Sequence, residues 1–114
     1  MISHLKSKEE EHQEAVADGT RTYILSEASR CMFCGFCEAL CPTLPLGPHR
    51  GYGPRGRVNI ALGLARGNFK FSREAINSLY SCLLCEACHL KCPASLDIVG
   101  VIRAARALYS SSLR

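Results

Sequence analysis

Apolar residues recur with helical spacing in the middle of the chain. Four of them fall at i, i+3, i+4 and i+7, the spacing of one helix face: Val58, Ala61, Leu62 and Ala65. Gly67 follows at the point where a helix ends in a left-handed residue. The next segment begins at Ser72, a favourable N-cap residue, and its apolar stripe consists of Ala75, Ile76, Leu79 and Tyr80. Both segments are predicted to be helices.

The C-terminal segment shows the clearest helical pattern. Ser95 is expected to cap this helix, and Arg103 and Arg106 mark its polar side. Its apolar face is expected to consist of Ile98, Val101, Ile102, Ala105, Leu108 and Tyr109. A further segment, residues 23–30, precedes the first cysteine. Ile24 and Leu25 are also compatible with a strand there, but an internal repeat favours a helix. We predict an all-α domain of four or five short helices.

Composition limits the size and class of the protein. The chain has 114 residues, eight of them cysteine, and a formal net charge of +4. This length fits one domain with a modest core, and 47% hydrophobic with 21% charged residues excludes disorder along the whole chain. Residues 1–27 carry a net charge of −3 and residues 28–114 carry +7. We therefore expect an acidic, partly mobile segment over residues 1–21, either a frayed helix or an arm, and a domain over residues 22–114.

Targeting and enzymatic motifs are not found in the sequence. The first residues lack the apolar run of a secretory signal, and no stretch is apolar for long enough to span a membrane. We expect a cytoplasmic protein, and any association with a membrane would be through a partner subunit. The sequence contains no dinucleotide-binding, P-loop or nucleophile–base motif, so no substrate site of its own is expected.

The eight cysteines form an internal repeat. Residues 31–42 and 82–93 both follow the pattern C-x2-C-x2-C-x3-C-P, with an offset of 51 residues at every cysteine and at the proline. The cysteines are Cys31, Cys34, Cys37 and Cys41 in the first run and Cys82, Cys85, Cys88 and Cys92 in the second. This run is typical of bacterial iron–sulfur proteins. In a reducing compartment such cysteines bind metal more often than they form disulfides.

The repeat predicts two 4Fe–4S clusters with crossed ligation. In two-cluster proteins of this type, the fourth cysteine of each run binds the other cluster. Cluster one would be held by Cys31, Cys34, Cys37 and Cys92, and cluster two by Cys82, Cys85, Cys88 and Cys41. Disulfides, zinc and a 3Fe–4S centre are the alternatives. The regular third and fourth cysteines argue against zinc, and a 3Fe–4S centre would lack a ligand that is present here.

Basic residues between the two runs have two interpretations. Residues 47–57 are rich in glycine and proline, which predicts a loop, and their arginines would fit an RNA-binding segment. We expect instead a loop that covers a cluster, with Arg55 and Arg57 close to the anionic cofactors. Two clusters and their thiolates would bring the formal charge from +4 to about zero. The positive charge then compensates the cofactors, and no nucleic-acid partner is expected.

Two side chains beside the second cysteine run invite a functional hypothesis. His89 occupies the repeat position of Glu38, and we expect a packed or exposed side chain rather than a group that tunes the cluster. Glu86 lies between two cysteines of the run. Negative charge opposes reduction, so Glu86 is expected to give the second cluster the lower potential.

Three stretches resemble the alpha-helical ferredoxin domain over about residues 22–109: CGFCEALCPT, PRGRVNIALGLARG and SCLLCEACHLKCP. That domain occurs in the two-cluster iron–sulfur subunit of heterodisulfide reductase. It also occurs in the iron–sulfur subunits of glycolate oxidase, lactate oxidation and anaerobic glycerol-3-phosphate dehydrogenase systems. The resemblance implies an all-α fold around two 4Fe–4S clusters, and a role as an electron-transfer subunit.

The resemblance leaves three function classes open. The first is a two-cluster subunit of a heterodisulfide reductase-like complex, which relays single electrons between a flavin or iron–sulfur subunit and a CCG-domain subunit; the lack of a CCG run up to Arg114 favours it. The second is the iron–sulfur subunit of a flavin-linked hydroxyacid or glycerol-3-phosphate dehydrogenase, and the third is a free ferredoxin. The expected partners are protein subunits of a redox complex, without nucleic acid and without membrane insertion.

Overall fold

A computed structural model describes residues 8–68 and 70–112 of the chain, with side chains from residue 18 onward. Within these residues it consists of helices and turns and has no strand. The α-helices are α1 (Lys8–Ala28), α2 (Pro54–Arg66), α3 (Arg73–Tyr80) and α4 (Ile98–Ser112). Short 3₁₀ turns are η1 (Phe36–Leu40), η2 (Leu44–Leu46), η3 (Arg50–Tyr52) and η4 (Ala87–Lys91). The prediction of an all-α fold is confirmed.

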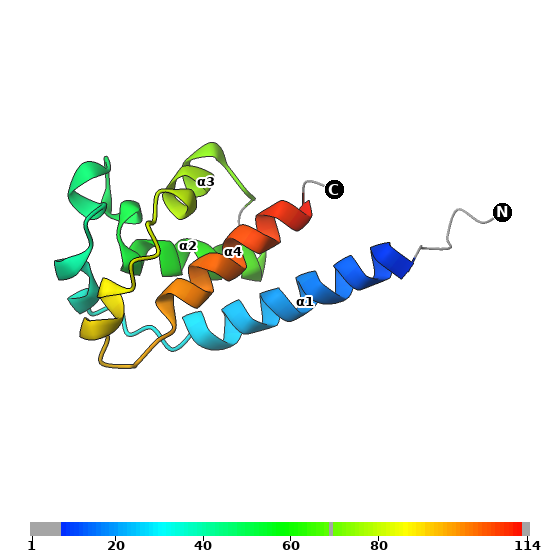
Figure 1. Ribbon diagram of the computed structural model, residues 1–114, viewed down its shortest axis with the longest axis horizontal. Coiled ribbons are helices and arrows are strands. Elements are labelled where there is room, and N and C mark those ends of the chain that lie inside the picture. Colours follow the sequence, from blue (N-terminus) through cyan, green and yellow to red (C-terminus); the bar gives the residue numbers. More distant parts are fainter. Residues whose placement is uncertain (1–7, 69, 113–114) are drawn as a thin grey trace.

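The helices form a scaffold, and the turns gather at one end of it (Figure 1). Helices α1 and α4 lie side by side in opposite directions, and α2 packs against both. The turns η1 and η4 contact each other, at the end of the molecule away from the C-terminal end of α4. Because the cysteine runs contain these two turns, the fold brings both runs to the same end.

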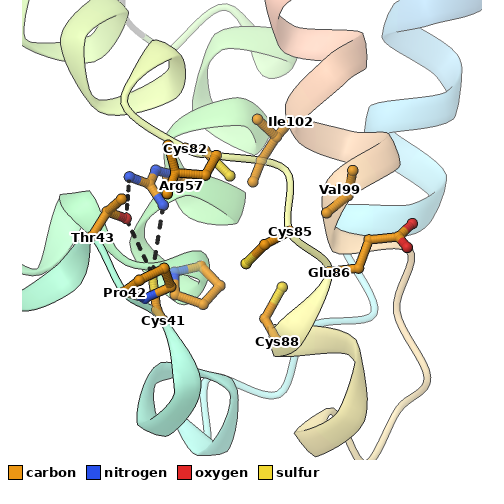
Figure 2. A pocket seen from close by; sticks show the side chains of 12 residues that line it. Cys41, Pro42, Thr43, Arg57, Cys82, Cys85, Glu86, Cys88, Val99 and Ile102 are labelled. Carbon is orange, nitrogen blue, oxygen red and sulfur yellow. Dashed lines mark hydrogen bonds between the residues drawn. The ribbon is translucent and has the colours of Figure 1, made fainter.

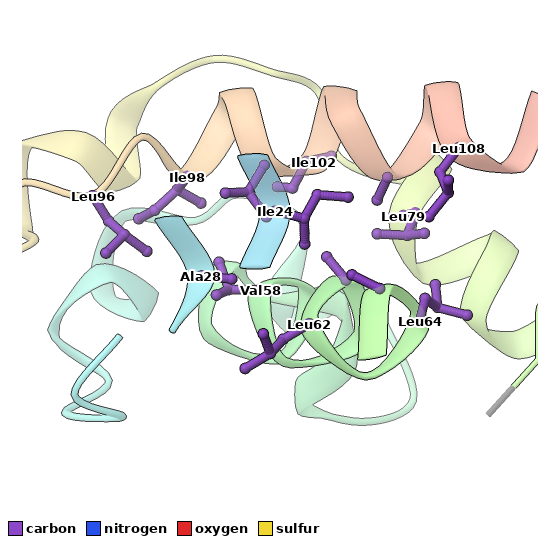
Figure 3. Close-up of a cluster of buried hydrophobic side chains, with 14 of the residues drawn as sticks. Ile24, Ala28, Val58, Leu62, Leu64, Leu79, Leu96, Ile98, Ile102 and Leu108 are labelled. Atoms are coloured by element: carbon purple, nitrogen blue, oxygen red, sulfur yellow. The ribbon is translucent and has the colours of Figure 1, made fainter. Parts of the chain in front are cut away.

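The hydrophobic core lies between the four helices (Figure 3). Its most deeply buried members are Ile24 and Ala28 of α1, Val58 and Ala61 of α2, Leu79 of α3, and Val101, Ile102 and Ala105 of α4. The predicted apolar stripes supply most of them. Tyr80 is an exception, because it is 45% exposed and its ring contacts Tyr109 and the Arg106 guanidinium.

Helix α1 is longer than the sequence predicted. It runs without a break from Lys8 to Ala28, which settles the choice between strand and helix for most of residues 23–30. The acidic residues from position 8 onward belong to the same helix, and residues 1–7 lie outside the described part. The division of the chain at residue 22 stays a prediction.

The N-terminal end of α4 differs from the prediction. Asp97, not Ser95, caps the helix, because its Oδ1 accepts the Gly100 N–H at 3.1 Å. The other carboxylate oxygen of Asp97 accepts a hydrogen bond from the hydroxyl of Tyr23 in α1. This hydrogen bond raises the pKa of Tyr23 to about 12, together with burial and the negative charges of Asp97 and Glu27. The cap therefore also joins α4 to α1.

Arg106 was expected on the polar side of α4 but is half-buried. Its guanidinium donates to the carbonyl of Leu79 at 2.8 and 3.0 Å and to the carbonyl of Cys82 at 2.7 Å. These carbonyls lie where α3 ends and the second cysteine run begins. Arg106 therefore fixes that run to the scaffold.

Gly67 ends helix α2 as predicted. It has φ 76°, and the Gly67 and Asn68 N–H groups donate back to Leu64 and Gly63 at 3.2 and 2.9 Å. A Cβ at Gly67 would meet nothing within 4 Å. A substitution there therefore causes no steric clash and acts only through the cost of the left-handed backbone conformation.

Gly67→Ala is expected to lower the free energy of unfolding by about 1 kcal/mol, because alanine disfavours the left-handed conformation. The measurement is the thermal midpoint of the cluster-loaded protein under anaerobic conditions, which should fall by roughly 4–8 °C. Gly19→Ala, in helix α1, is the control and should not lower the midpoint. An unchanged midpoint for Gly67→Ala would show that the left-handed cap carries no strain.

Candidate metal centres

The two cysteine runs adopt the same backbone conformation. Turns η1 and η4 occupy identical repeat positions, 51 residues apart. Left-handed residues also recur: Phe33 and Leu84 have φ 57° and 58°, and Gly35 and Glu86 have φ 76° and 67°. Three of these four residues are not glycine, and for each of the three the left-handed conformation costs about 1–2 kcal/mol. Such strained residues concentrate at functional sites. Here the left-handed residues turn the backbone so that each cysteine trio forms a loop.

Each loop forms one side of a pocket that is completed by a cysteine of the other run. The first pocket is lined by Cys31, Cys34, Cys37 and Cys92. The second is lined by Cys82, Cys85, Cys88 and Cys41 (Figure 2). The structure thus brings the eight sequence-predicted ligands together as two groups of four.

The remaining pocket walls are mostly apolar. The first pocket is lined by Met32, Val58, Leu96 and Ile98, and the second by Pro42, Pro54, Val99 and Ile102, among others. In the described part of the chain, no three His, Cys, Asp or Glu side chains converge where one metal ion would fit. Four cysteines around a wider space are the donor set of a 4Fe–4S cluster. The residues therefore fit this cofactor.

Thiol burial follows the repeat as well. Cys37 and Cys88 are buried, whereas Cys34 and Cys85 are exposed. Desolvation, with the nearby Cys31 thiol, raises the pKa of Cys37 to about 11, and desolvation with the Cys37 thiol raises the pKa of Cys88 to about 12. Both thiols are protonated at neutral pH without metal, and ligation displaces these protons. The exposed cysteines place one edge of each pocket at the surface.

Cys41 has a different electrostatic environment. Burial raises its pKa, but hydrogen bonds from Thr43 and the Leu44 N–H, with the charge of Arg57, outweigh burial and leave the pKa below its ordinary value. The Thr43 hydroxyl lies 3.2 Å from the Cys41 sulfur. The pKa of Cys41 is therefore shifted in the direction opposite to those of Cys37 and Cys88.

Arg57 is the buried charged group beside this cysteine and is only 1% exposed. Its Nη1 lies 3.8 Å from the Cys41 sulfur (Figure 2). The other donors reach the Ser78 carbonyl at 2.7 Å, the Thr43 hydroxyl at 2.9 Å and the Ser81 hydroxyl at 2.7 Å. These acceptors are neutral. Among the carboxylates whose side chains are described, none forms an ion pair with Arg57.

Beside the first pocket the positive charge is paired. Arg55 lines that pocket, and its guanidinium lies 3.3 Å from the carboxylate of Glu38, which Arg50 approaches to 3.7 Å. Arg55 also donates to the carbonyl of Phe33 at 3.2 Å. Arg55 therefore holds the first cysteine loop, with Glu38 balancing its charge.

The prediction of a loop over residues 47–57 is wrong at its C-terminal end, because Pro54 starts helix α2. Pro54 has no N–H and suits the first turn of a helix. The expectation that this segment covers a cluster pocket is confirmed, because Pro54 and Arg57 line the second pocket and Arg55 lines the first.

His89 has a structural contact, in line with the expectation of a packed side chain. Its Nε2 accepts the N–H of Val99 at 3.1 Å, in the first turn of α4. Sequence reasoning missed Thr43, Ser78 and Ser81, which surround Arg57. Isolated hydroxyl residues carry no spacing signal, so only the fold could reveal them.

The fold and the pockets define a small all-α iron–sulfur protein of the electron-transfer class. Residues 27–96 match the family described as the 4Fe-4S dicluster domain, and the chain belongs to this family. It accordingly carries two 4Fe–4S clusters, which resolves the zinc and disulfide alternatives. The sequence resemblance to iron–sulfur subunits of this type is confirmed.

Three curated relatives show similarity to the chain. The probable glycolate oxidase iron-sulfur subunit of Bacillus subtilis is 31% identical over 90% of this chain, and the glycolate oxidase iron-sulfur subunit of Escherichia coli is 36% identical over 58%. An uncharacterized electron transport protein of Escherichia coli is 30% identical over 87% of the chain. The matches cover 22%, 16% and 21% of these relatives, so the chain spans about a fifth of their length.

No solved structure matches the chain significantly. Within residues 8–68 and 70–112, no helix is both long and apolar enough to cross a membrane.

Proposed function

We propose that the chain relays single electrons through two 4Fe–4S clusters within a flavin-linked complex that oxidises a 2-hydroxyacid. The observation that carries the proposal is the pair of cysteine-lined pockets at one end of the molecule. The hydroxyacid class is supported by the two glycolate oxidase relatives. They favour this role over the heterodisulfide reductase-like role with a CCG-domain partner, which stays a prediction.

The proposed ligands follow the pocket linings. Cluster one is held by Cys31, Cys34, Cys37 and Cys92, and cluster two by Cys82, Cys85, Cys88 and Cys41. A bound 4Fe–4S cluster accepts and releases one electron at a time. The apolar walls shield the buried ligands Cys37 and Cys88 from water, whereas the exposed Cys34 and Cys85 bring each cluster edge close to the surface, where a partner can approach.

Anaerobic purification from the source organism tests the proposed complex. Co-elution with a flavoprotein that oxidises a hydroxyacid is the expected result. Co-elution with a CCG-domain protein and no flavoprotein would favour the heterodisulfide reductase-like role. A chain that elutes alone, with both clusters, would overturn the proposal and favour a free ferredoxin.

The partner is proposed to dock on apolar side chains of the two cysteine runs. These side chains are between 52% and 80% exposed, and they belong to Met32, Phe33, Phe36, Leu83 and Leu90. Aromatic residues and methionine are enriched in protein interfaces. Contact at these loops would bring the flavoprotein next to the exposed ligands Cys34 and Cys85. The exposed apolar side chains and the exposed ligands both support docking of the flavin-bearing partner at this end of the molecule.

Phe36→Ser with Leu90→Ser is expected to weaken binding to the co-purified flavoprotein by at least about tenfold, because a few buried anchors dominate most interfaces. Binding is measured by titration of the purified partner, and both cluster potentials should stay unchanged. Ala107→Ser, on the exposed side of α4, is the control and should bind normally. Unaltered affinity in the double variant would place the interface elsewhere.

A further inference from the structure

We infer that Arg57 gives cluster two the higher reduction potential of the two clusters, so that a single electron rests on cluster two. The inference rests on the proposed ligation of that cluster by Cys41. It reverses the order expected from Glu86 alone. The two pockets differ in the charges that face them and in how deeply each charge is buried.

Around the second pocket, the buried charge is positive, and no carboxylate whose side chain is described forms an ion pair with it. Arg57 is 1% exposed, donates to three neutral oxygens, and points Nη1 at the Cys41 sulfur from 3.8 Å. Reduction adds one negative charge to a cluster, so a nearby positive charge favours the reduced form. Burial strengthens the effect, because a charge in the interior is screened far less than one in water.

Glu86 opposes this effect only weakly. It is exposed, and Figure 2 shows its carboxylate turned away from the sulfurs of Cys85 and Cys88. Solvent and salt screen an exposed charge over short distances. The buried arginine therefore outweighs the exposed glutamate at this cluster.

Around the first pocket, the charges largely cancel. Arg55 lines the pocket, but the Glu38 carboxylate lies 3.3 Å from it and is itself mostly buried. Arg50 adds a second positive charge at 3.7 Å from Glu38, but its side chain is 75% exposed and screened. Cluster one consequently experiences a smaller net positive field than cluster two.

Thr43 adds a second contribution to the same cluster. Its hydroxyl accepts a hydrogen bond from Arg57, and its single proton is shared between the Tyr52 carbonyl at 3.0 Å and the Cys41 sulfur at 3.2 Å. At the corresponding repeat position after Cys92, the residue is Ala94, which has no hydroxyl. Hydrogen bonds to ligand sulfurs raise the potential of iron–sulfur clusters. The repeat is thus asymmetric in both charge and hydrogen bonding, and both differences favour reduction of cluster two.

Redox titration followed by EPR tests this order in the anaerobically loaded protein. Thr43→Val identifies cluster two, because it removes the hydroxyl beside Cys41, and should lower the midpoint of one of the two reduction steps. In the unmodified protein that step should be the one at higher potential. If the altered step is the lower one, the inference is overturned.

Arg57 variants provide the second measurement. Arg57→Gln should lower the same midpoint by more than Thr43→Val does, whereas Arg57→Lys, which keeps the charge, should restore most of the shift. The matched control is Glu38→Gln with Arg55→Gln, which removes a charge pair and should shift cluster one less than Arg57→Gln shifts cluster two. Glu86→Gln should raise the cluster-two midpoint only slightly.

Two outcomes separate this inference from the proposed function. Two intact clusters whose potentials do not respond to Arg57→Gln would overturn the inference and leave the proposed electron relay standing. Loss of a cluster in Arg57→Gln would be a structural effect. The inference would then be decided by whether Thr43→Val lowers the midpoint of the higher or of the lower reduction step. Iron and sulfide content, measured on every variant, distinguishes these cases.

Discussion

In a variant that lacks Cys82 and Cys85, removal of Cys92 is expected to destroy the remaining cluster, whereas removal of Cys41 should leave it intact. The reason is that the first pocket combines a trio from one run with Cys92 of the other. If each run bound its own cluster, Cys41 would be required and Cys92 would be dispensable. Iron content and the EPR signal of the reduced protein measure which alanine substitution removes the cluster.

The mirror-image variants provide the control. When Cys31 and Cys34 are replaced instead, the second pocket retains its trio, and Cys41 should become essential while Cys92 becomes dispensable. The two sets differ only in which run is disabled, so a general loss of stability would affect both alanine substitutions equally. Two results would contradict crossed ligation. In one, Cys41 alone or Cys92 alone is required in both backgrounds. In the other, each cluster requires the fourth cysteine of its own intact run.

The local elements of this fold could be predicted because their signals are local. The stripe from Val58 to Ala65 and the stop at Gly67 depend on residues close in sequence, and both agree with the structure. The cap of α4 did not follow from local signals, since Ser95 and Asp97 are both good N-cap residues. The fold decides between them: Ser95 adopts φ 53°, and Asp97 also accepts the Tyr23 hydroxyl from another helix.

The candidate site shows the same distinction. Cysteine spacing identified all eight candidate ligands, since iron–sulfur proteins repeat that spacing along the chain. The sequence also placed Arg55 and Arg57 close to the cofactors but treated them alike. Their difference depends on tertiary contacts, because Glu38 neutralises Arg55, whereas Arg57 is enclosed by hydroxyl and carbonyl oxygens. The electrostatic asymmetry between the clusters could therefore not be predicted from composition.

Helix α1 shows a further limit of sequence patterns. The acidic residues from position 8 have no apolar stripe that would predict a packed helix, yet α1 is continuous to Ala28. Its C-terminal part is anchored by Ile24 and Ala28, which are fully buried against α2 and α4. Once that part is helical, extension towards the N-terminus adds one hydrogen bond per residue without a new nucleation cost.

Removal of both clusters is expected to unfold the cysteine loops while the helical core keeps its structure. Phe33, Leu84 and Glu86 are held in left-handed conformations, and relief of that strain at one residue alone favours opening by about tenfold. Without iron, the buried thiols Cys37 and Cys88 also have no bonded partner to hold the loops around them. By contrast, most of the deeply buried core lies outside both pocket linings, namely Ile24, Ala28, Ala61, Leu79, Val101 and Ala105. Val58 and Ile102 are also deeply buried but do line a pocket.

Hydrogen exchange read by mass spectrometry measures this effect on protein loaded with clusters and on protein stripped by acid and chelator. Peptides covering residues 31–43 and 82–96 should exchange at least about tenfold faster after stripping, whereas peptides from α1 and α4 should change less. Leu79→Ala in the loaded protein is the matched contrast. Leu79 is fully buried, so this variant should lose about 2–5 kcal/mol of stability and speed exchange in α3 and α4 first. Equal acceleration over the whole chain after stripping would instead mean that clusters and core form one cooperative unit.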